Sequence, residues 1–251
     1  MRYGVGGYLA LCLLGLIDCV SSASASVVIG GTRVVYPASQ RDVSVQLMNQ
    51  GDSPALVQVW IDAGDAGVTP EAARVPFVVL PPLSRIEPAS GQVVRIAFTG
   101  EADLPENRES VYWLNVLDVP PLPEGDDRVP QNYMQLAVRS RIKLFFRPRG
   151  LKGNANQAPE SLNWSLTAPE GGGPALRVEN PTPYHVSLAR LRIPSAAGYQ
   201  TVPLGDRSML DPLGSARFPL PADLPETAES IEITTINDFG GRVTRTVPLA
   251  R

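Results

Sequence analysis

Short runs of alternating apolar and polar residues recur along the chain from residue 26 onward, and none shows a sustained helical period. In the first half they predict strands at Val27–Tyr36 (interrupted by Gly30-Gly31), Asp42–Asn49, Ala55–Ile61, Phe77–Leu80, Gln92–Phe98, Ser110–Leu117 and Gln131–Phe146. Seven strands in roughly 120 residues is the number expected of one immunoglobulin-like sandwich, with Trp60 as its buried aromatic. The class predicted is all-β.

The segment Arg147-Pro148-Arg149-Gly150 ends the last of these strands. Proline cannot continue a central strand and glycine frees the chain, so we expect a hinge here. The remaining residues are punctuated by prolines and end in two further predicted strands, Ile231–Ile236 and Arg242–Leu249. The pattern therefore predicts a second, smaller sandwich, with domains at residues 26–147 and 148–251.

The first 25 residues have the layout of a secretory signal peptide. Arg2 precedes an apolar run, Leu9–Ile17, and the small residues Ala23-Ser24-Ala25 offer a cleavage site. The mature chain is then expected to begin near Ser26. Lipoprotein processing at Cys19 is the alternative, which the preceding aspartate disfavours. Both cysteines of the chain fall within the signal, so no disulfide is predicted.

Composition narrows the function classes. The formal net charge is −3 and the pI is about 5.3, which disfavours a nucleic-acid binder. His185 is the sole histidine, and we expect it to be a half-exposed strand residue rather than part of a catalytic triad. Nucleophile-elbow, zinc-cluster and P-loop patterns are missing from the sequence. We therefore expect no enzyme activity, no metal and no cofactor.

Two cations interrupt otherwise apolar strands. Arg33 lies in the first predicted strand, and Lys143 lies in the last strand of the first domain. Each could simply face solvent. Alternatively, the two strands run toward the same end of the sandwich and the cations meet, in which case a carboxylate or phosphate would hold them together. Glu109, at the mouth of another strand, also needs a cationic partner if it is buried.

Six segments together resemble the periplasmic pilus chaperones of the chaperone–usher pathway: Gly31–Pro37, Leu80–Leu83, Leu104–Asn115, Arg141–Pro148, Asn180–Tyr184 and Ile236–Gly241. The resemblance extends over the whole mature chain. It implies two immunoglobulin-like β-sandwich domains set at an angle with a cleft between them. It also implies a location in the periplasm, with no nucleic acid as partner and no stable membrane insertion.

The same resemblance implies residue roles. Arg33 and Lys143 would grip the C-terminal carboxylate of a pilus subunit, and Glu109, Arg147 and Asp238 would form a buried ionic triad between the domains. The strand residues that complete the subunit's incomplete sandwich, by donor-strand complementation, would be Met134, Leu136 and Val138.

The partners implied are pilus subunits (pilins and adhesin) and an outer-membrane usher, with self-capping of the free protein left open. The segment Pro81-Pro82-Leu83 is either an usher contact or a structural turn. The modest loop Pro120–Pro130 and the lack of mature cysteines place the chain closer to the members that serve rod-like pili. A fibre subunit or adhesin, and a secreted β-sandwich hydrolase, are the rival functions.

Overall fold

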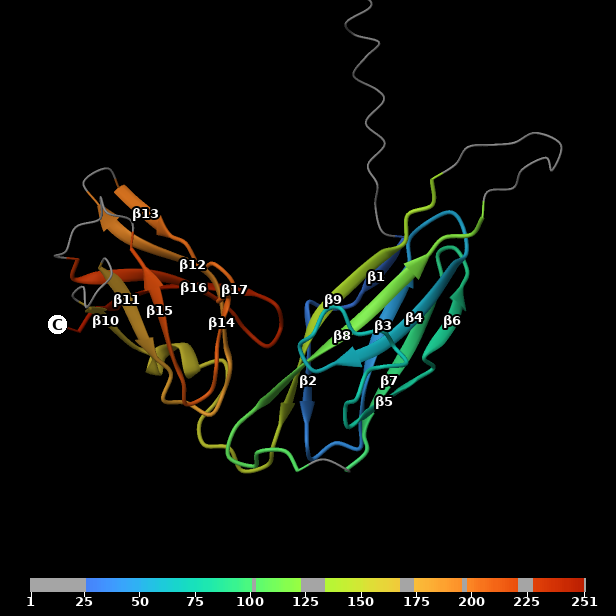
Figure 1. Cartoon of the computed structure of the whole chain (residues 1–251), viewed down its shortest axis with the longest axis horizontal. Coiled ribbons are helices and arrows are strands. Elements are labelled where there is room, and N and C mark those ends of the chain that lie inside the picture. Colours follow the sequence, from blue (N-terminus) through green and yellow to red (C-terminus); the bar gives the residue numbers. More distant parts are fainter. Residues whose placement is uncertain are drawn as a thin grey trace, which may run out of the picture.

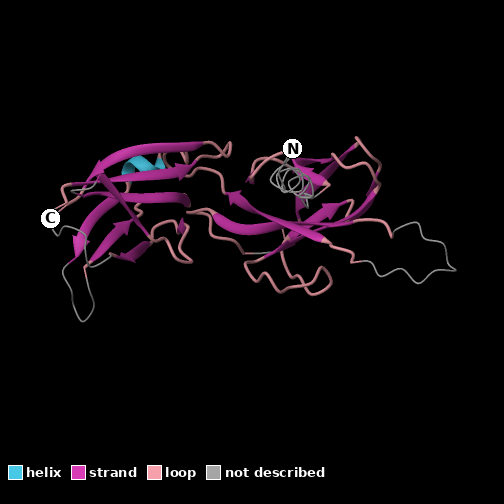
Figure 2. Cartoon of the chain, turned by 90° about the horizontal axis from the view of Figure 1, so that it is seen from above, coloured by secondary structure: helices cyan, strands magenta, loops and turns pink. Residues whose placement is uncertain are grey.

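The computed structural model describes residues 26–100, 103–122, 134–167, 174–195, 198–220 and 228–250. Strands β1 to β9 form one lobe and β10 to β17 form the other (Figure 1). Apart from one 3-10 turn, η1 (Ala158–Ser161), all regular structure in these ranges is β (Figure 2). The predicted all-β class with two sandwiches is confirmed. In the described part of the chain, no helix is long and apolar enough to cross a membrane.

The first lobe is a sandwich of two sheets. One sheet has the order β1-β3-β7-β5, and the other has the order β2-β9-β8-β4-β6. Their bounds are β1 Val27–Ile29, β2 Arg33–Pro37, β3 Asp42–Asn49, β4 Ala55–Asp62, β5 Phe77–Leu80, β6 Leu83–Ile86, β7 Gly91–Phe98, β8 Ser110–Val119 and β9 Val138–Arg147. Alternate residues of both sheets fill the core; Leu47, Val94, Ile96 and Leu114 are fully buried.

The second lobe is also a sandwich of two sheets, with a core of its own around Trp164, Leu191 and Phe218. One sheet has the order β10-β11-β15, and the other has the order β13-β12-β16-β17 with β14 paired to β12. Their bounds are β10 Asn163–Thr167, β11 Ala175–Glu179, β12 Val186–Ser195, β13 Gly198–Val202, β14 Met209–Leu210, β15 Ser215–Pro219, β16 Ser230–Ile236 and β17 Arg242–Pro248. We keep the division after Arg147 as a proposal; β9 ends at that residue.

The first predicted strand is two strands in different sheets. β1 pairs antiparallel with β3, whereas β2 pairs parallel with β9 in the opposite sheet. The chain crosses between the sheets at Gly30-Gly31, where Gly30 still donates its N–H to the carbonyl of Gln46 at 2.8 Å. A side chain at position 30 would meet that carbonyl at 3.3 Å, which explains why glycine suits the crossover.

Two other strand predictions need correction. The last strand of the first domain begins at Val138 rather than Gln131; residues 131–133 lie outside the described ranges, and Met134 to Ala137 are not paired into a sheet. β6 was not predicted at all, because Leu83–Ile86 is short and follows two prolines. It pairs with β4 at the edge of the sheet, where prolines beside a strand are tolerated.

Trp60 is buried, as expected, but it is not part of the main core. Val57, Val59 and Ile61 of β4 point into the core, so Trp60 points to the opposite face of the sheet. There the guanidinium of Arg139 covers its ring, 4.6 Å from the centroid. The aromatic centre of the core is instead Phe77, whose ring packs against Tyr36 and Tyr112.

Candidate functional site

The parallel ladder between β2 and β9 brings the two predicted cations together. Arg33 pairs with Lys143 at its first rung, and Pro37 pairs with Arg147 at its last. Residues directly opposite in a parallel pair point to the same face. Both side chains therefore lie on the face away from the core, at the boundary with the second domain.

Among the described residues, only neutral acceptors hydrogen-bond to these two cations. Arg33 Nη1 donates to the carbonyl of Ile236 at 3.0 Å and approaches Ser187 Oγ at 3.5 Å, and Lys143 Nζ donates to the same hydroxyl at 3.2 Å. Arg33 Nε is buried without an acceptor among the described residues. Burial lowers the pKa of Lys143 to about 8, with the Arg33 charge adding to the effect. Burial also lowers the pKa of Arg33, although Asp238 offsets part of this. The pair is thus a half-buried positive site with no ion-pair partner among the described residues.

At the other end of the ladder, Arg147 is fully compensated. Its Nε donates to Glu109 Oε1 at 2.7 Å, and its two terminal nitrogens donate to Asp238 at 2.9 and 3.1 Å. Burial alone would lower the pKa of Arg147, but the hydrogen bond to Asp238 and the charges of both carboxylates outweigh it and raise that pKa. The structure therefore brings Glu109, Arg147 and Asp238 together across the two domains.

His185 belongs to the same cluster, and the prediction of a half-exposed strand residue was wrong. The residue precedes β12, and its side chain is 5% exposed. Its backbone N–H donates to Glu109 Oε2 at 2.9 Å, and its Nδ1 lies 3.3 Å from the same oxygen. The sequence pattern did not reveal this contact, because it joins residues 76 positions apart. A histidine between a proline-rich turn and a strand was the only signal in the sequence.

The loop Asn237–Gly241 positions Asp238. The side-chain oxygen of Asn237 accepts the backbone N–H groups of Phe239 and Gly241, at 3.1 and 2.8 Å, which closes the turn. Gly240 adopts a positive φ of 83° and faces Thr32 of the first domain. A Cβ at Gly240 would lie 2.5 Å from the Thr32 hydroxyl, so only glycine lets this loop pack beside Arg33.

Beyond the cation pair, the outer edge of β9 is open. β2 pairs only with Lys143 and the residues after it, so in the described chain no strand covers that edge from Val138 to Ile142. The three predicted donor residues are exposed: Met134 by 82%, Leu136 by 55% and Val138 by 38%. A groove of about 330 Å³ runs beside this edge, with Val34, Val43, Val45 and Ile142 in its walls.

A third charged cluster, which sequence reasoning missed, ties β9 to its own sheet. Arg141 donates twice to Asp62, whose side chain is fully buried, and Asn115 donates to the same carboxylate at 2.8 Å. Burial alone would raise the pKa of Asp62, but these hydrogen bonds lower it. The cluster braces the strand whose outer edge is free. Alternating Arg-x-Arg-x-Lys on β9 was its sequence signal.

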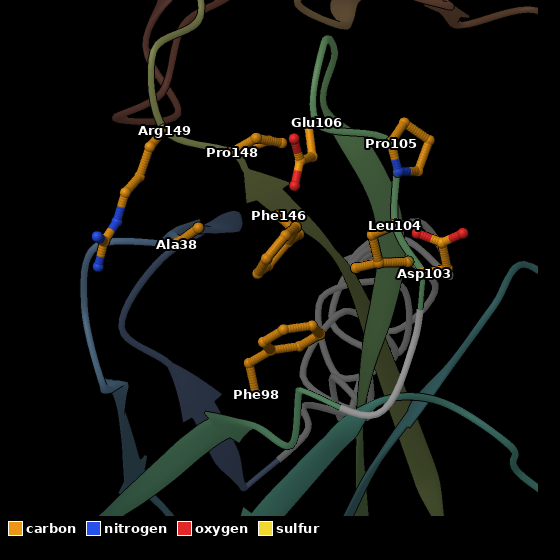
Figure 3. Close-up of a pocket in the computed structure, with 9 residues that line it drawn as sticks. All are labelled: Ala38, Phe98, Asp103, Leu104, Pro105, Glu106, Phe146, Pro148 and Arg149. Carbon is orange, nitrogen blue, oxygen red and sulfur yellow. The ribbon is translucent and has the colours of Figure 1, made fainter.

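A second pocket lies at the Pro37 end of the ladder, away from the cation pair. Its volume is about 360 Å³, and the rings of Phe98 and Phe146 line its interior (Figure 3). Asp103 and Glu106 stand on one side and Arg149 on the other (Figure 3). Phe98 and Phe146 also pack against one another, with centroids 4.6 Å apart. This pocket is an opening at the end of the core rather than an extension of the cation site. Among the described residues, no cluster of side chains could hold a metal ion.

The chain has two sandwiches joined by a charged boundary, one of them with an open strand edge, and comparison with known proteins finds this architecture among pilus-assembly chaperones. Residues 26–152 match the family described as "Pili and flagellar-assembly chaperone, PapD N-terminal domain". Residues 157–247 match "Pili assembly chaperone PapD, C-terminal domain". The chain therefore belongs to the PapD family of pilus-assembly chaperones, and chaperones are not a class of enzymes.

Individual relatives give the same result. The chain is 41% identical to the probable fimbrial chaperone YadV of Escherichia coli K12 over 93% of this chain and 94% of that protein. It is 41% identical to the chaperone protein FimB/FhaD of Bordetella pertussis over 94% of this chain and 93% of that protein. The crystal structure of YadV superposes with a TM-score of 0.73 at 40% identity, covering 89% of this chain and all of that one. The SafB chaperone of Salmonella enterica, solved in complex with the SafA pilin, superposes with a TM-score of 0.72 at 29% identity, covering 91% and 99%.

Proposed function

We propose that this chain is exported to the periplasm, folds and caps pilus subunits (pilins and adhesin) by donor-strand complementation, and delivers them to an outer-membrane usher. One observation carries the proposal: exposed apolar side chains in the segment that leads into β9, the unpaired edge of β9 and an under-compensated cation pair at its β2 partner follow one another. The family membership and the SafB–SafA complex support a subunit as the occupant.

The open strand edge, the apolar side chains and the cation pair each contribute differently to binding. The open backbone of β9 supplies hydrogen bonds to any added strand, which gives affinity without sequence preference. Met134, Leu136 and Val138 cover the apolar groove of a subunit that lacks a strand. A carboxylate bound at Arg33 and Lys143 sets the register, since a slip by one residue would turn the apolar side chains outward. The groove beside Ile142 would receive an apolar side chain of the subunit near its carboxylate.

Delivery to an usher requires an exposed surface elsewhere on the first domain. Leu80 and Leu83 are 50% and 54% exposed, on either side of the two prolines. The carbonyl of Pro82 accepts the N–H of Val59 at 2.8 Å, so the segment also serves as a structural turn. We propose the exposed leucines as the usher contact and the prolines as the turn that presents them. The signal peptide and the Cys19 alternative lie outside the described residues, so export is inferred from the sequence pattern.

Leu136→Glu tests the capping mechanism. A carboxylate at this position would be desolvated in a subunit groove at a cost of several kcal/mol, so subunits should no longer co-purify from the periplasm. In the free protein the side chain is exposed, and stability should change by less than about 1 kcal/mol. Val78→Glu, at a 43% exposed position on an edge strand of the other sheet, is the matched control and should retain subunits. If Leu136→Glu unfolds the domain, the segment is core and the mechanism is wrong.

A further inference from the structure

The buried carboxylate of Asp118 accepts hydrogen bonds from the first two residues that the structure describes. Its Oδ2 accepts the backbone N–H of Ser26 at 3.0 Å, the Ser26 hydroxyl at 2.7 Å and the N–H of Val27 at 3.1 Å. Asp118 lies in β8 and is 5% exposed, and its Oδ1 has no hydrogen-bond partner in the part of the chain that the structure describes.

A buried carboxylate with neutral donors alone is costly, because its charge remains uncompensated. The other two buried acidic side chains of this domain are ion-paired: Asp62 has two arginines within 4.0 Å, and Glu109 lies 2.7 Å from Arg147. Asp118 forms no ion pair with any arginine, lysine or histidine of the described residues. The described residues therefore offer this carboxylate no side-chain cation.

The backbone at Ser26 is held on both sides. Its carbonyl accepts the N–H of Gln50 at 2.7 Å, and Val27 pairs with Asn49 at the first rung of the β1–β3 ladder. The nitrogen of Ser26 is thus fixed at Asp118 whatever precedes it. Immediately before it stands Ala23-Ser24-Ala25, whose small residues suit signal peptidase.

Hydrolysis of the Ala25–Ser26 peptide bond consumes one water. Ala25 leaves with a new carboxylate, and the nitrogen of Ser26 becomes a primary amine, which takes up a proton at neutral pH. We propose that Asp118 is the binding site for this new α-ammonium, so that cleavage at this one bond completes the first domain. The proposal depends on the export proposed above but not on how subunits are bound.

The first measurement is the intact mass of the protein recovered from the periplasm, which must correspond to a chain beginning at Ser26. A start at Val27, at an earlier residue or at Cys19 would overturn the proposal. The second measurement compares melting temperatures of two purified forms, one beginning at Ser26 and one beginning at Ser24. We expect the extended form to melt about 2–4 °C lower, since it keeps the hydrogen bond and lacks the charge.

Asp118→Asn, prepared in the same two forms that begin at Ser26 and at Ser24, separates the effect of the charge from a steric effect of the extension. With the carboxylate gone, the two forms should melt at the same temperature. If the extension lowers the melting temperature equally in the wild type and in Asp118→Asn, it acts by steric hindrance. If it does not lower the melting temperature of the wild type, Asp118 does not bind the ammonium. Asp118→Ser replaces Asp118→Asn if the latter does not fold. Subunit co-purification plays no part in these readouts, so they can fail while the chaperone function stands.

Discussion

Two charged clusters lie at the two ends of the five-residue β2–β9 ladder, and they differ in what balances their cations. At the first rung, Arg33 and Lys143 share the Ser187 hydroxyl, and Arg33 also donates to the carbonyl of Ile236. At the last rung, Arg147 is bound by two carboxylates, one from each domain. The two strands are the same, and the second domain contributes to both clusters.

The balance of charge distinguishes the contact that joins the two domains from the site that we propose for a subunit carboxylate. All three nitrogens of Arg147 donate to carboxylates, and these partners join the two domains. Arg33 and Lys143 repel one another, and Arg33 Nε is buried without an acceptor among the described residues. A carboxylate would supply charge-assisted hydrogen bonds to this pair. The pKa directions agree: that of Arg147 is raised, and those of Arg33 and Lys143 are lowered.

The largest expected effect is on the compensated cluster. Glu109→Ala removes one carboxylate from Arg147 and the acceptor of the His185 N–H, and should cost about 3–5 kcal/mol of the free energy of unfolding. Thermal or denaturant unfolding measures this. Glu106→Ala, three residues earlier and exposed, should change stability by less than about 0.5 kcal/mol. Equal stability of the two variants would show that the triad does not stabilise the contact between the two domains.

The under-compensated cluster should show the opposite behaviour. Arg33→Ala and Lys143→Ala should each weaken subunit binding by about 1.5–3 kcal/mol while the protein remains folded. Titration of a purified subunit against each variant measures this loss. Lys152→Ala removes the other lysine of the chain, which is exposed, and should bind as the wild type does. Wild-type affinity in either cleft variant would refute the carboxylate site.

pH should separate binding from stability at Lys143. Its pKa of about 8 means that only about one-tenth of the free protein carries this charge at pH 9, so subunit affinity should be about tenfold lower than at pH 7. The unfolded chain keeps the proton to higher pH than the folded one, so this residue makes stability rise as pH increases above about 8. Lys143→Arg should remove both trends. A wild-type affinity that is flat from pH 7 to 9 would contradict the prediction.

The smallest expected effect comes from the histidine of the compensated cluster. His185→Gln removes the ring from Glu109 but leaves the backbone N–H bond, so the loss should be about 0.5–1.5 kcal/mol of unfolding free energy. Denaturant unfolding alongside Glu109→Ala measures the difference. A loss as large as that of Glu109→Ala would mean that the ring, rather than the main chain, holds the carboxylate.

The sequence determined what depends on local pattern. Alternation placed β3 and β5 at their observed bounds, because a strand with one buried face has to alternate. It also singled out Arg33 and Lys143, since a cation inside an apolar strand is conspicuous. Met134, Leu136 and Val138 were recognisable by resemblance and by their period of two.

Only the tertiary structure decided which groups balance which charges. That Asp62 holds Arg141, that His185 joins Glu109, and that Asp118 meets Ser26 all depend on residues 76 to 92 positions apart. The start of β9 at Val138 was likewise decided by where its partners end, because apolar alternation continues past the last hydrogen-bonded rung. Periodicity reports which face a side chain occupies, whereas pairing between distant strands sets its neighbours. Those neighbours pair Arg147 with carboxylates of both domains and give Arg33 and Lys143 only neutral acceptors among the described residues.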